Sequence, residues 1–490
     1  MAKELVHSFE GELPEGWATA TIGDLISPEG VFIDGDWVES KDQDPNGDVR
    51  LIQLADIADG YYKDKSERFL TKEKALKLNC TFLKKGDVLI ARMPDPLGRA
   101  CIFPGDAKES VTVVDVCVVR TGTEVVNNKW LMYWVNSPRF RNTIASLQSG
   151  TTRKRISRGN LATITFPVPP SEQQKRIVAK IEELFSHIDA GIEALKKAKQ
   201  LLKQYRQSVL KAAVTGELTK EWREANKDKL EPASQLLERI LKERRQKWEE
   251  QQLEQFKAKG KMPRDDKWKE KYVEPELYNK KPSFEIPTEW TWIYLGQMGE
   301  VIGGLTKNKK REQFELQLPY LRVANVYANE LRLDDITMIG VQESELERLL
   351  LEKGDLLVVE GNGSPEQIGR LAIWDGSIDP CVHQNHLIKV RLQEKASGNY
   401  LMYWLSSLGG RDAILKVASS TSGLYTLSIS KVSGLPIPLP PIEEQVEIHN
   451  IVSLKLSSIE HLENEIDVQL LKAERNKQSV LASAFSGNIQ

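Results

Sequence analysis

The chain has 490 residues, 40% of them hydrophobic and 28% charged. This composition excludes wholesale disorder or a collagen-like protein, and the length predicts at least two domains. The 68 Lys and Arg residues against 70 Asp and Glu residues leave a net charge of −2, so any binding of nucleic acid must come from local basic patches. Four cysteines (Cys80, Cys101, Cys117, Cys381) are too few for a disulfide framework. With neither a signal peptide nor an apolar run of about 18–20 residues, we expect a cytoplasmic protein.

The chain repeats itself in order along its length. The matched segments are LPEGW (13–17) and IPTEW (286–290), LKKGDVLIAR (83–92) and LEKGDLLVVE (351–360), LGRACIF (97–103) and IGRLAIW (368–374), LMYW (131–134 and 401–404), PVPPSEQQ (167–174) and PLPPIEEQ (438–445), and QSVL (207–210 and 478–481). Because the offset stays between 268 and 273 residues throughout, these matches indicate an internal duplication.

The first part of each copy carries short β-branched runs such as DVLIA and DLLVVE, broken by Gly, Pro and Asp turns. These runs predict the strands of a small mixed α/β domain. The LMYW segments predict short helices that lie on that sheet.

The second part of each copy predicts a long helix. Ser171 follows two prolines and precedes Gln174 by three residues, which is typical of a capping box. Apolar residues then recur every three or four positions, the heptad pattern of a coiled coil. They are Ile181, Leu184, Ile188, Gly191, Leu195, Ala198, Leu202, Tyr205 and Val209 in the first copy, and Val452, Ile459, Leu462, Ile466, Ala473 and Val480 in the second. A helix with one apolar seam needs a partner, and its duplicate supplies one. The residues alone leave parallel and antiparallel packing open.

Between the copies lies a segment of different character. Residues 218–285 hold 18 Lys and Arg against 15 Asp and Glu, and their pattern predicts a solvated helical spacer. The alternative is a helix that docks a partner through Leu237, Ile240, Leu241 and Trp248. The predicted division is a domain at 1–170, a helix at 171–216, a charged linker at 217–285, a domain at 286–441 and a helix at 442–490.

The chain lacks the motifs of common catalytic sites. There is no phosphate-binding loop, no dinucleotide-binding glycine pattern and no zinc-protease motif. Cys381, His383 and His386 lie close together, but no fourth metal ligand accompanies them. We therefore expect a chain that is not an enzyme and carries no metal or cofactor.

Four segments resemble the conserved helical regions of type I restriction–modification specificity (S) subunits, in particular the enterobacterial-type subgroup. They are PVPPSEQQKRIVAKIEELF, QSVLKAAVTGELTKEWR, PLPPIEEQVEIHNIV and QSVLASAFSGNIQ. The LPEGW, KKGDVLIAR and SGTT elements look like the target recognition domains of that family. The resemblance covers essentially the whole chain, although the insertion at 230–281 exceeds the expected spacer.

The resemblance implies an α+β fold in which a pair of long antiparallel coiled-coil helices separates two duplicated recognition domains with pseudo-twofold symmetry. It implies a non-catalytic subunit whose domains each read one half of a bipartite, asymmetric DNA target. The helices would set the gap between the halves and dock two adenine methyltransferase (M) subunits, through which two restriction (R) subunits join. S-adenosylmethionine, ATP and Mg would then be bound by the partner subunits. No membrane is involved.

Several side chains are suited to contact DNA. The loop SGTTRKRISRGN (149–160) places four cations among small polar residues, which suits phosphate binding. Lys307, Lys309 and Lys310, next to Arg311, form a second basic cluster, while Gln53 and Arg322 occupy matching positions and are able to address base edges. Arg99 and Arg370 recur in both copies and are expected to be structural. The predicted DNA-binding set is Gln53, Arg92, Thr151, Thr152, Arg153, Lys154, Arg155, Arg158, Lys307, Lys309, Lys310, Arg322, Asn362, Gln384, Asn385 and Ser422.

Two other functions remain possible on the sequence. A scaffold or adaptor would use the duplicated domains to hold proteins without touching DNA, which suits the near-neutral net charge. An enzyme with an unrecognised active site is the other. Sequence-selective, salt-sensitive DNA binding in the presence of the methyltransferase partner distinguishes the DNA reader from both.

Overall fold

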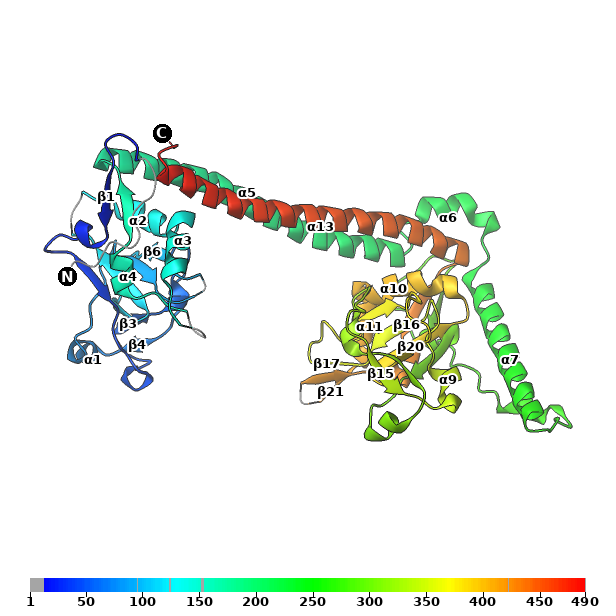
Figure 1. The fold of residues 1–490 in the computed structure, drawn as a ribbon. Coiled ribbons are helices and arrows are strands. Elements are labelled where there is room, and N and C mark those ends of the chain that lie inside the picture. Colours follow the sequence, from blue (N-terminus) through cyan, green and yellow to red (C-terminus); the bar gives the residue numbers. More distant parts are fainter. Residues whose placement is uncertain (1–12, 95, 123–124, 151–153, 422, 490) are drawn as a thin grey trace. The chain divides into compact units, whose positions relative to one another are not determined.

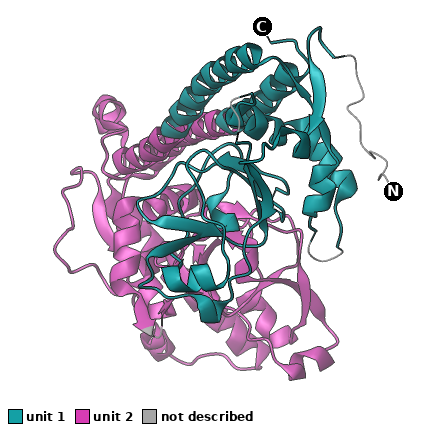
Figure 2. Cartoon of the chain, turned by 90° about the vertical axis from the view of Figure 1, so that its left-hand side faces the viewer, with its two compact units in different colours: residues 1–198, 465–490 teal, residues 199–464 magenta. Residues whose placement is uncertain are grey.

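The computed structural model describes residues 13–94, 96–122, 125–150, 154–421 and 423–489. The chain divides into two compact units, residues 1–198 with 465–490 (unit 1) and residues 199–464 (unit 2), which Figure 2 colours separately. Each unit contains the globular domain of one copy and a part of both long helices.

The domain of the first copy is built from short buried strands. Among the described residues, a four-stranded antiparallel sheet has the order β2-β8-β5-β6, and a three-stranded sheet has the order β4-β3-β7, in which β3 and β7 are parallel. All four side chains of β5 are buried, as its continuous apolar run VLIA requires. The elements are β1 (Ala18–Thr21), β2 (Val31–Asp34), β3 (Val49–Ile52), β4 (Phe69–Leu70), α1 (Lys72–Lys77), β5 (Val88–Ala91), β6 (Ala100–Ile102), β7 (Glu109–Thr112), β8 (Val116–Arg120), α2 (Asn128–Val135), α3 (Pro138–Leu147), α4 (Arg158–Ala162) and β9 (Thr165–Val168).

The domain of the second copy repeats this topology. Its four-stranded sheet has the order β11-β20-β16-β18, and its three-stranded sheet has the order β15-β12-β19, again with one parallel pair, β12 and β19. The elements are β10 (Thr291–Tyr294), α8 (Leu295–Met298), β11 (Gly299–Gly303), β12 (Gln317–Leu321), β13 (Val326–Tyr327), β14 (Glu330–Leu331), β15 (Thr337–Gly340), α9 (Glu343–Leu349), β16 (Leu356–Val359), β17 (Gly361–Asn362), β18 (Leu371–Ile373), β19 (Val382–His383), β20 (Leu387–Leu392), α10 (Gly398–Ser406), α11 (Leu408–Val417), β21 (Ser419–Thr421), β22 (Leu424–Thr426), α12 (Ile429–Ser433) and β23 (Pro436–Leu439). The LMYW segments lie in α2 and α10, and both helices contact their sheets, as predicted.

Two helices of 44 residues, α5 (Ser171–Val214) and α13 (Ile442–Phe485), form the predicted pair (Figure 1). In unit 1 Lys477 binds Asp189, and in unit 2 Arg206 Nη2 donates to Glu463 Oε2 at 2.8 Å. The apolar contacts agree with these ion pairs. In unit 1 the start of α5 belongs to the same hydrophobic cluster as the end of α13, and in unit 2 the end of α5 belongs to the same cluster as the start of α13. The helices are therefore antiparallel.

The seam of α5 differs from the prediction in two places. Ile192 is buried whereas Gly191 is exposed, and Tyr205 is about half exposed. In α13 Leu462 is also exposed. A straight α-helix has 3.6 residues per turn, so a strict heptad reading drifts off the buried face over several turns.

The predicted capping box at the start of α5 is wrong. Gln174 does not bond the backbone of Ser171. Its Nε2 donates to Pro169 O at 2.9 Å and to Val125 O at 3.2 Å, and its Oε1 accepts from Asn127 N at 2.8 Å. Gln174 is thus a buried link between α5 and the loop that precedes α2.

Each long helix ends in the hydrophobic core of the other copy's domain. Phe485, at the end of α13, lies against Trp130 and Trp134 of α2, with ring centroids 4.5 and 5.1 Å apart. The end of α5, from Val209 to Val214, joins the core of the second domain in the same way. The glycine that follows each helix has positive φ, and a Cβ there would lie 2.5 Å from Pro287 Cγ at Gly216 and 2.3 Å from Pro14 Cγ at Gly487. Both cores are completed by a helix that is remote in sequence.

The charged segment between the copies is helical, as predicted, but it packs against the second domain and is therefore not a solvated spacer. α6 (Lys220–Asn226) precedes α7 (Ala233–Ala258), and α7 buries Ala233, Leu236 and Ile240 completely in the core of the second domain. Further along α7, Trp248 stacks on Trp268, with ring centroids 6.0 Å apart. The predicted docking residue Ile240 is therefore covered by this chain itself.

A buried ion pair joins α6 to the start of α13. Glu444 is fully buried, and its Oε1 accepts from Arg223 Nη1 and Thr219 Oγ1, both at 2.6 Å. Its Oε2 accepts from Trp290 Nε1 at 2.8 Å. At the matching place in the first copy, Gln173 Oε1 accepts from Trp17 Nε1 at 3.1 Å. In both copies, the Trp of the first repeated motif thus bonds the residue at the start of the long helix that follows the Pro-Pro motif.

Candidate nucleic-acid interface

The two domains have one structurally equivalent edge, at which β5 and β16 end. Arg92 follows β5, and its backbone N–H donates to Asp115 O at 2.9 Å, while Ile156 N donates to Arg92 O at 3.1 Å. Glu360 follows β16 and makes the same two bonds, from its own N–H to His386 O at 2.9 Å and from Leu427 N at 2.8 Å. The backbone of this edge is shared, whereas its side chains differ.

In the first copy the side chains at this edge form an ionic cluster. Arg92 Nε lies 3.2 Å from Asp34 Oδ1, and its Nη2 donates to Val114 O at 2.7 Å. Arg158 Nη1 donates to Phe32 O at 2.9 Å, and its Nε lies 3.9 Å from Asp34 Oδ2. Only 12% of the Arg92 side chain is exposed. A DNA contact by Arg92 would therefore replace bonds that it already makes, whereas Arg158 remains accessible.

The basic loop of the first copy is closed by a β-bridge. Ser149 N donates to Arg155 O and Arg155 N donates to Ser149 O, both at 2.9 Å. Lys154 and Arg155 are exposed. Thr151, Thr152 and Arg153, together with Ser422 of the second copy, lie outside the described residues. The second copy has a hairpin here, in which β22 pairs with β21 and with β17.

The second basic cluster lies on a 3₁₀ turn at Lys309–Gln313. Lys307, Lys309 and Lys310 are exposed. Arg311 instead donates to both carboxylate oxygens of Glu345, at 3.0 and 2.9 Å, and this pairing raises the pKa of its guanidinium. The three lysines remain accessible to a phosphate backbone, while Arg311 fixes the turn.

The predicted base readers lie at the ends of strands. Gln53 follows β3 and Arg322 follows β12, and each begins an equivalent 3₁₀ turn. Arg322 Nη2 donates to Asp335 Oδ2 at 2.7 Å, and Gln384 Oε1 accepts from Val323 N at 3.2 Å. Asn362 Oδ1 accepts from Ser364 N at 2.9 Å. Arg322 and Gln384 thus lie next to each other in the second copy, and DNA contact by all these residues stays a prediction.

The repeated Gly-Arg positions are structural, as expected. Arg99 Nε donates to Ile57 O, and Arg370 Nε donates to the matching Val326 O, both at 2.7 Å. Each guanidinium bonds the turn that follows one strand of the three-stranded sheet, β3 in the first copy and β12 in the second.

The cluster of Cys381, His383 and His386 does not converge on a metal site. Among the described residues, no group of three or more His, Cys, Asp or Glu side chains is placed to hold a metal ion. Burial raises the pKa of the Cys381 thiol to about 12 and lowers the pKa of His383 to about 3, the latter with help from Lys389. His383 is therefore a neutral core residue. His386 is exposed and bonds Glu360. The sequence did not predict this pair, because Glu360 follows β16 and His386 precedes β20, and only the pairing of these two strands brings them together.

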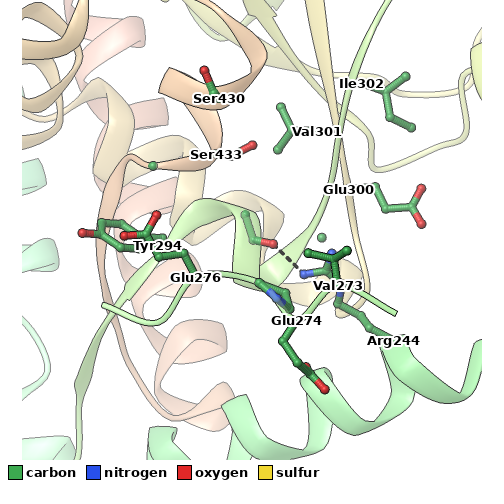
Figure 3. A pocket seen from close by; sticks show the side chains of 14 residues that line it. Arg244, Val273, Glu274, Glu276, Tyr294, Glu300, Val301, Ile302, Ser430 and Ser433 are labelled. Carbon is green, nitrogen blue, oxygen red and sulfur yellow. Dashed lines mark hydrogen bonds between the residues drawn. The ribbon is translucent and has the colours of Figure 1, made fainter. Parts of the chain in front are cut away.

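A pocket of about 580 Å³ lies elsewhere in unit 2, between the insertion and the second domain (Figure 3). Arg244 of α7 enters its lining and donates to Gly296 O at 2.5 Å and to Gln297 O at 3.1 Å. Burial lowers the pKa of Arg244. Since both acceptors are the backbone of α8, Arg244 attaches the insertion to the domain and is not a free cation.

Known proteins resemble this chain over nearly its full length. It is 25% identical over 489 residues to the EcoKI specificity subunit of Escherichia coli (strain K12), covering 98% of this chain and 90% of that protein. It is 23% identical over 486 residues to the StySPI specificity subunit of Salmonella potsdam, with the same shares covered. Both relatives are named as subunits of type I restriction enzymes.

Two solved structures have the same fold. One is a chain of a type I R-M system studied for its complex assembly and conformational transition, with a TM-score of 0.66 at 17% identity, covering 98% of this chain and 100% of that one. The other is the HsdS subunit from Thermoanaerobacter tengcongensis, with a TM-score of 0.50 at 17% identity, covering 98% and 99%. The expected fold of two duplicated domains with paired long helices is confirmed.

No helix in the described ranges has the length and apolar character needed to cross a membrane. The family model for the type I restriction modification DNA specificity domain matches residues 14–202 and 287–472, one match in each copy of the duplication. The chain therefore belongs to the family of type I restriction–modification specificity subunits.

Proposed function

We propose that each domain of this specificity subunit reads one half of a bipartite DNA target. The observation that carries the proposal is the shared edge at Arg92 and Glu360, where the same backbone presents different side chains. Near it the first copy exposes Lys154, Arg155 and Arg158, whereas the second copy exposes His386. The exposed lysines of the second copy, Lys307, Lys309 and Lys310, form a separate cluster. The two domains have the same backbone geometry at this edge but different side chains, which suits a target whose two halves differ in sequence.

The partner subunits supply the chemistry in this proposal. S-adenosylmethionine would be bound by two methyltransferase (M) subunits, and ATP and Mg by two restriction (R) subunits. The long helices offer apolar side chains that the chain itself leaves open, among them Leu201 and Leu454 in unit 2 and Leu471 in unit 1. Exposed leucines on the long helices support docking of a protein partner there, and we assign this docking to the M subunits.

A scaffold that holds proteins without touching DNA shares the exposed helix faces but needs no diverged basic loops. The test is an electrophoretic shift assay of this chain with its methyltransferase partner on a library of duplexes. We expect binding that selects a bipartite sequence and weakens as salt rises. Binding without sequence preference, or no binding, would favour the scaffold. The chain without partners should turn over neither S-adenosylmethionine nor ATP.

Replacing Arg153, Lys154 and Arg155 together with alanine should weaken binding to all sequences in similar measure, because phosphate contacts carry no sequence information. Log affinity falls with log salt, and each lost phosphate contact should make this negative slope shallower by about 0.9. The measurement is the shift assay repeated over a series of salt concentrations. An unchanged salt slope in the folded triple variant would contradict phosphate binding by this loop.

The matched control removes the same amount of charge from another part of the chain. Lys257, Lys259 and Lys261 are exposed and lie around the end of α7 in the insertion. Their joint replacement with alanine should leave the salt slope unchanged, since the proposed interface does not include them. If the slope of log affinity against log salt becomes equally shallow in both triple variants, the effect comes from net charge and not from this loop.

A further inference from the structure

The side chains at the shared edge differ in a way that changes which polar groups each copy exposes there. In the first copy Asp34 holds Arg92 and Arg158. Strand pairing places Gly303 at the position of Asp34, because Asp34 pairs with Cys117 of β8 and Gly303 pairs with the matching Ile388 of β20.

The second copy therefore lacks this ionic cluster. The residue that begins α12, Ile429, stands where Arg158 begins α4, and its Cδ1 would lie 3.2 Å from a Cβ at Gly303. An apolar contact takes the place of the ion pair. Glu360, at the position of Arg92, is left to bond a different partner.

That partner is His386, the residue that precedes β20. His386 Nδ1 lies 2.9 Å from Glu360 Oε2, and 57% of the His386 side chain is exposed against 29% of Glu360. A carboxylate oxygen only accepts, so Nδ1 carries the hydrogen. The opposite ring nitrogen, Nε2, lies 3.5 Å from Asn385 Nδ2, an amide nitrogen that only donates. With the hydrogen on Nδ1, the neutral ring has its single acceptor lone pair on Nε2, and a donor on a base would replace the long contact with Asn385.

We infer that His386 reads the half-site of the second copy by accepting a hydrogen bond at Nε2 from an exocyclic amino group, N6 of adenine or N4 of cytosine. Those amino groups are the donors that the major groove presents. Glu360 is a positioning residue, since it fixes the ring and its tautomer without touching the base. The inference rests on the proposed reading of DNA by this domain.

The test uses the full chain with its methyltransferase partner. The target is first defined with the wild-type complex on duplexes in which each base pair is changed in turn. His386→Ala should lose roughly five- to tenfold of the preference at one base pair in one half-site and leave the other half-site unchanged. Glu360→Ala should lose preference at the same base pair, whereas Glu360→Gln should restore it, because the Gln Oε1 still accepts from Nδ1. Glu347→Gln, an exposed change on α9 of the same domain, is the matched control.

A second measurement identifies the contacted group. The base at that pair is replaced by purine or 2-pyrimidinone, which lack the exocyclic amino group. The wild-type complex should lose affinity by the same factor, and the His386→Ala complex should lose none. A wild-type complex with no target would overturn the proposed function and this inference together. If a target exists, an unchanged preference in His386→Ala overturns the inference alone. Equal loss at every sequence would make His386 a phosphate contact and also overturn it.

Discussion

Phe485→Ala should lower the free energy of unfolding by about 3–5 kcal/mol, the cost of a large cavity in a packed core. The ring lies against both tryptophans of α2, and 3% of it is exposed. The loss should fall on the first domain, although Phe485 is at the other end of the chain. Urea denaturation followed by tryptophan fluorescence measures it.

Leu471→Ala is the matched control for this prediction. Leu471 lies on the same helix but is 54% exposed, so its truncation should change stability by no more than about 0.5 kcal/mol. If Phe485→Ala costs no more than Leu471→Ala, the end of α13 is not part of the core of the first domain.

Lengthening both long helices by one heptad should shift the preferred gap between half-sites by about three base pairs. A heptad inserted after Leu195 in α5 and another after Ile466 in α13 keep the apolar seam in phase and add about 10.5 Å to each helix. Both positions lie near the boundary at which the helices pass from one compact unit to the other. Binding to the original target should fall by several hundredfold or more, toward the non-specific level.

The readout is the methylation target of cells that carry the lengthened chain. The two half-site sequences should stay the same, because neither domain is altered. Three additional base pairs also rotate one half-site by nearly a third of a turn, so some affinity is lost even on the lengthened target. Extending α5 alone is the control, and it should disrupt the pair by moving its seam out of register. A doubly extended chain that folds, binds its partner and still selects the original gap would refute a role of the helices in spacing.

The sequence predicts the repeated architecture well, because the internal repeat identifies the two copies and the apolar periodicity identifies the long helices. Alternating runs and the apolar seam are local signals, and the repeat aligns Arg92 with Glu360 without any structure. Local signals do not reveal which face of helix α7 in the insertion is buried against the second domain. The burial of Ile240 in α7 depends on packing against a sheet whose residues come later in the chain.

The candidate interface was only partly predictable for the same reason. The exposed lysines at Lys307, Lys309 and Lys310 are visible as a cluster in the sequence. The contact of Arg92 with Asp34 joins residues that are far apart in the sequence, as does that of His386 with Glu360. A charge pattern identifies where cations are numerous, whereas tertiary packing decides which of them remain available to DNA.

The exchange of helix ends affects how the chain folds as it is synthesised. The first domain emerges from the ribosome early, but the residues that close its core, Leu481, Ala484 and Phe485, are made only after the insertion and the whole second domain. At about 5–20 residues per second, the nascent domain waits on the order of 20–60 s with Trp130 and Trp134 uncovered. An interrupted chain would retain this exposed aromatic surface, a feature by which chaperones and proteases distinguish incomplete proteins.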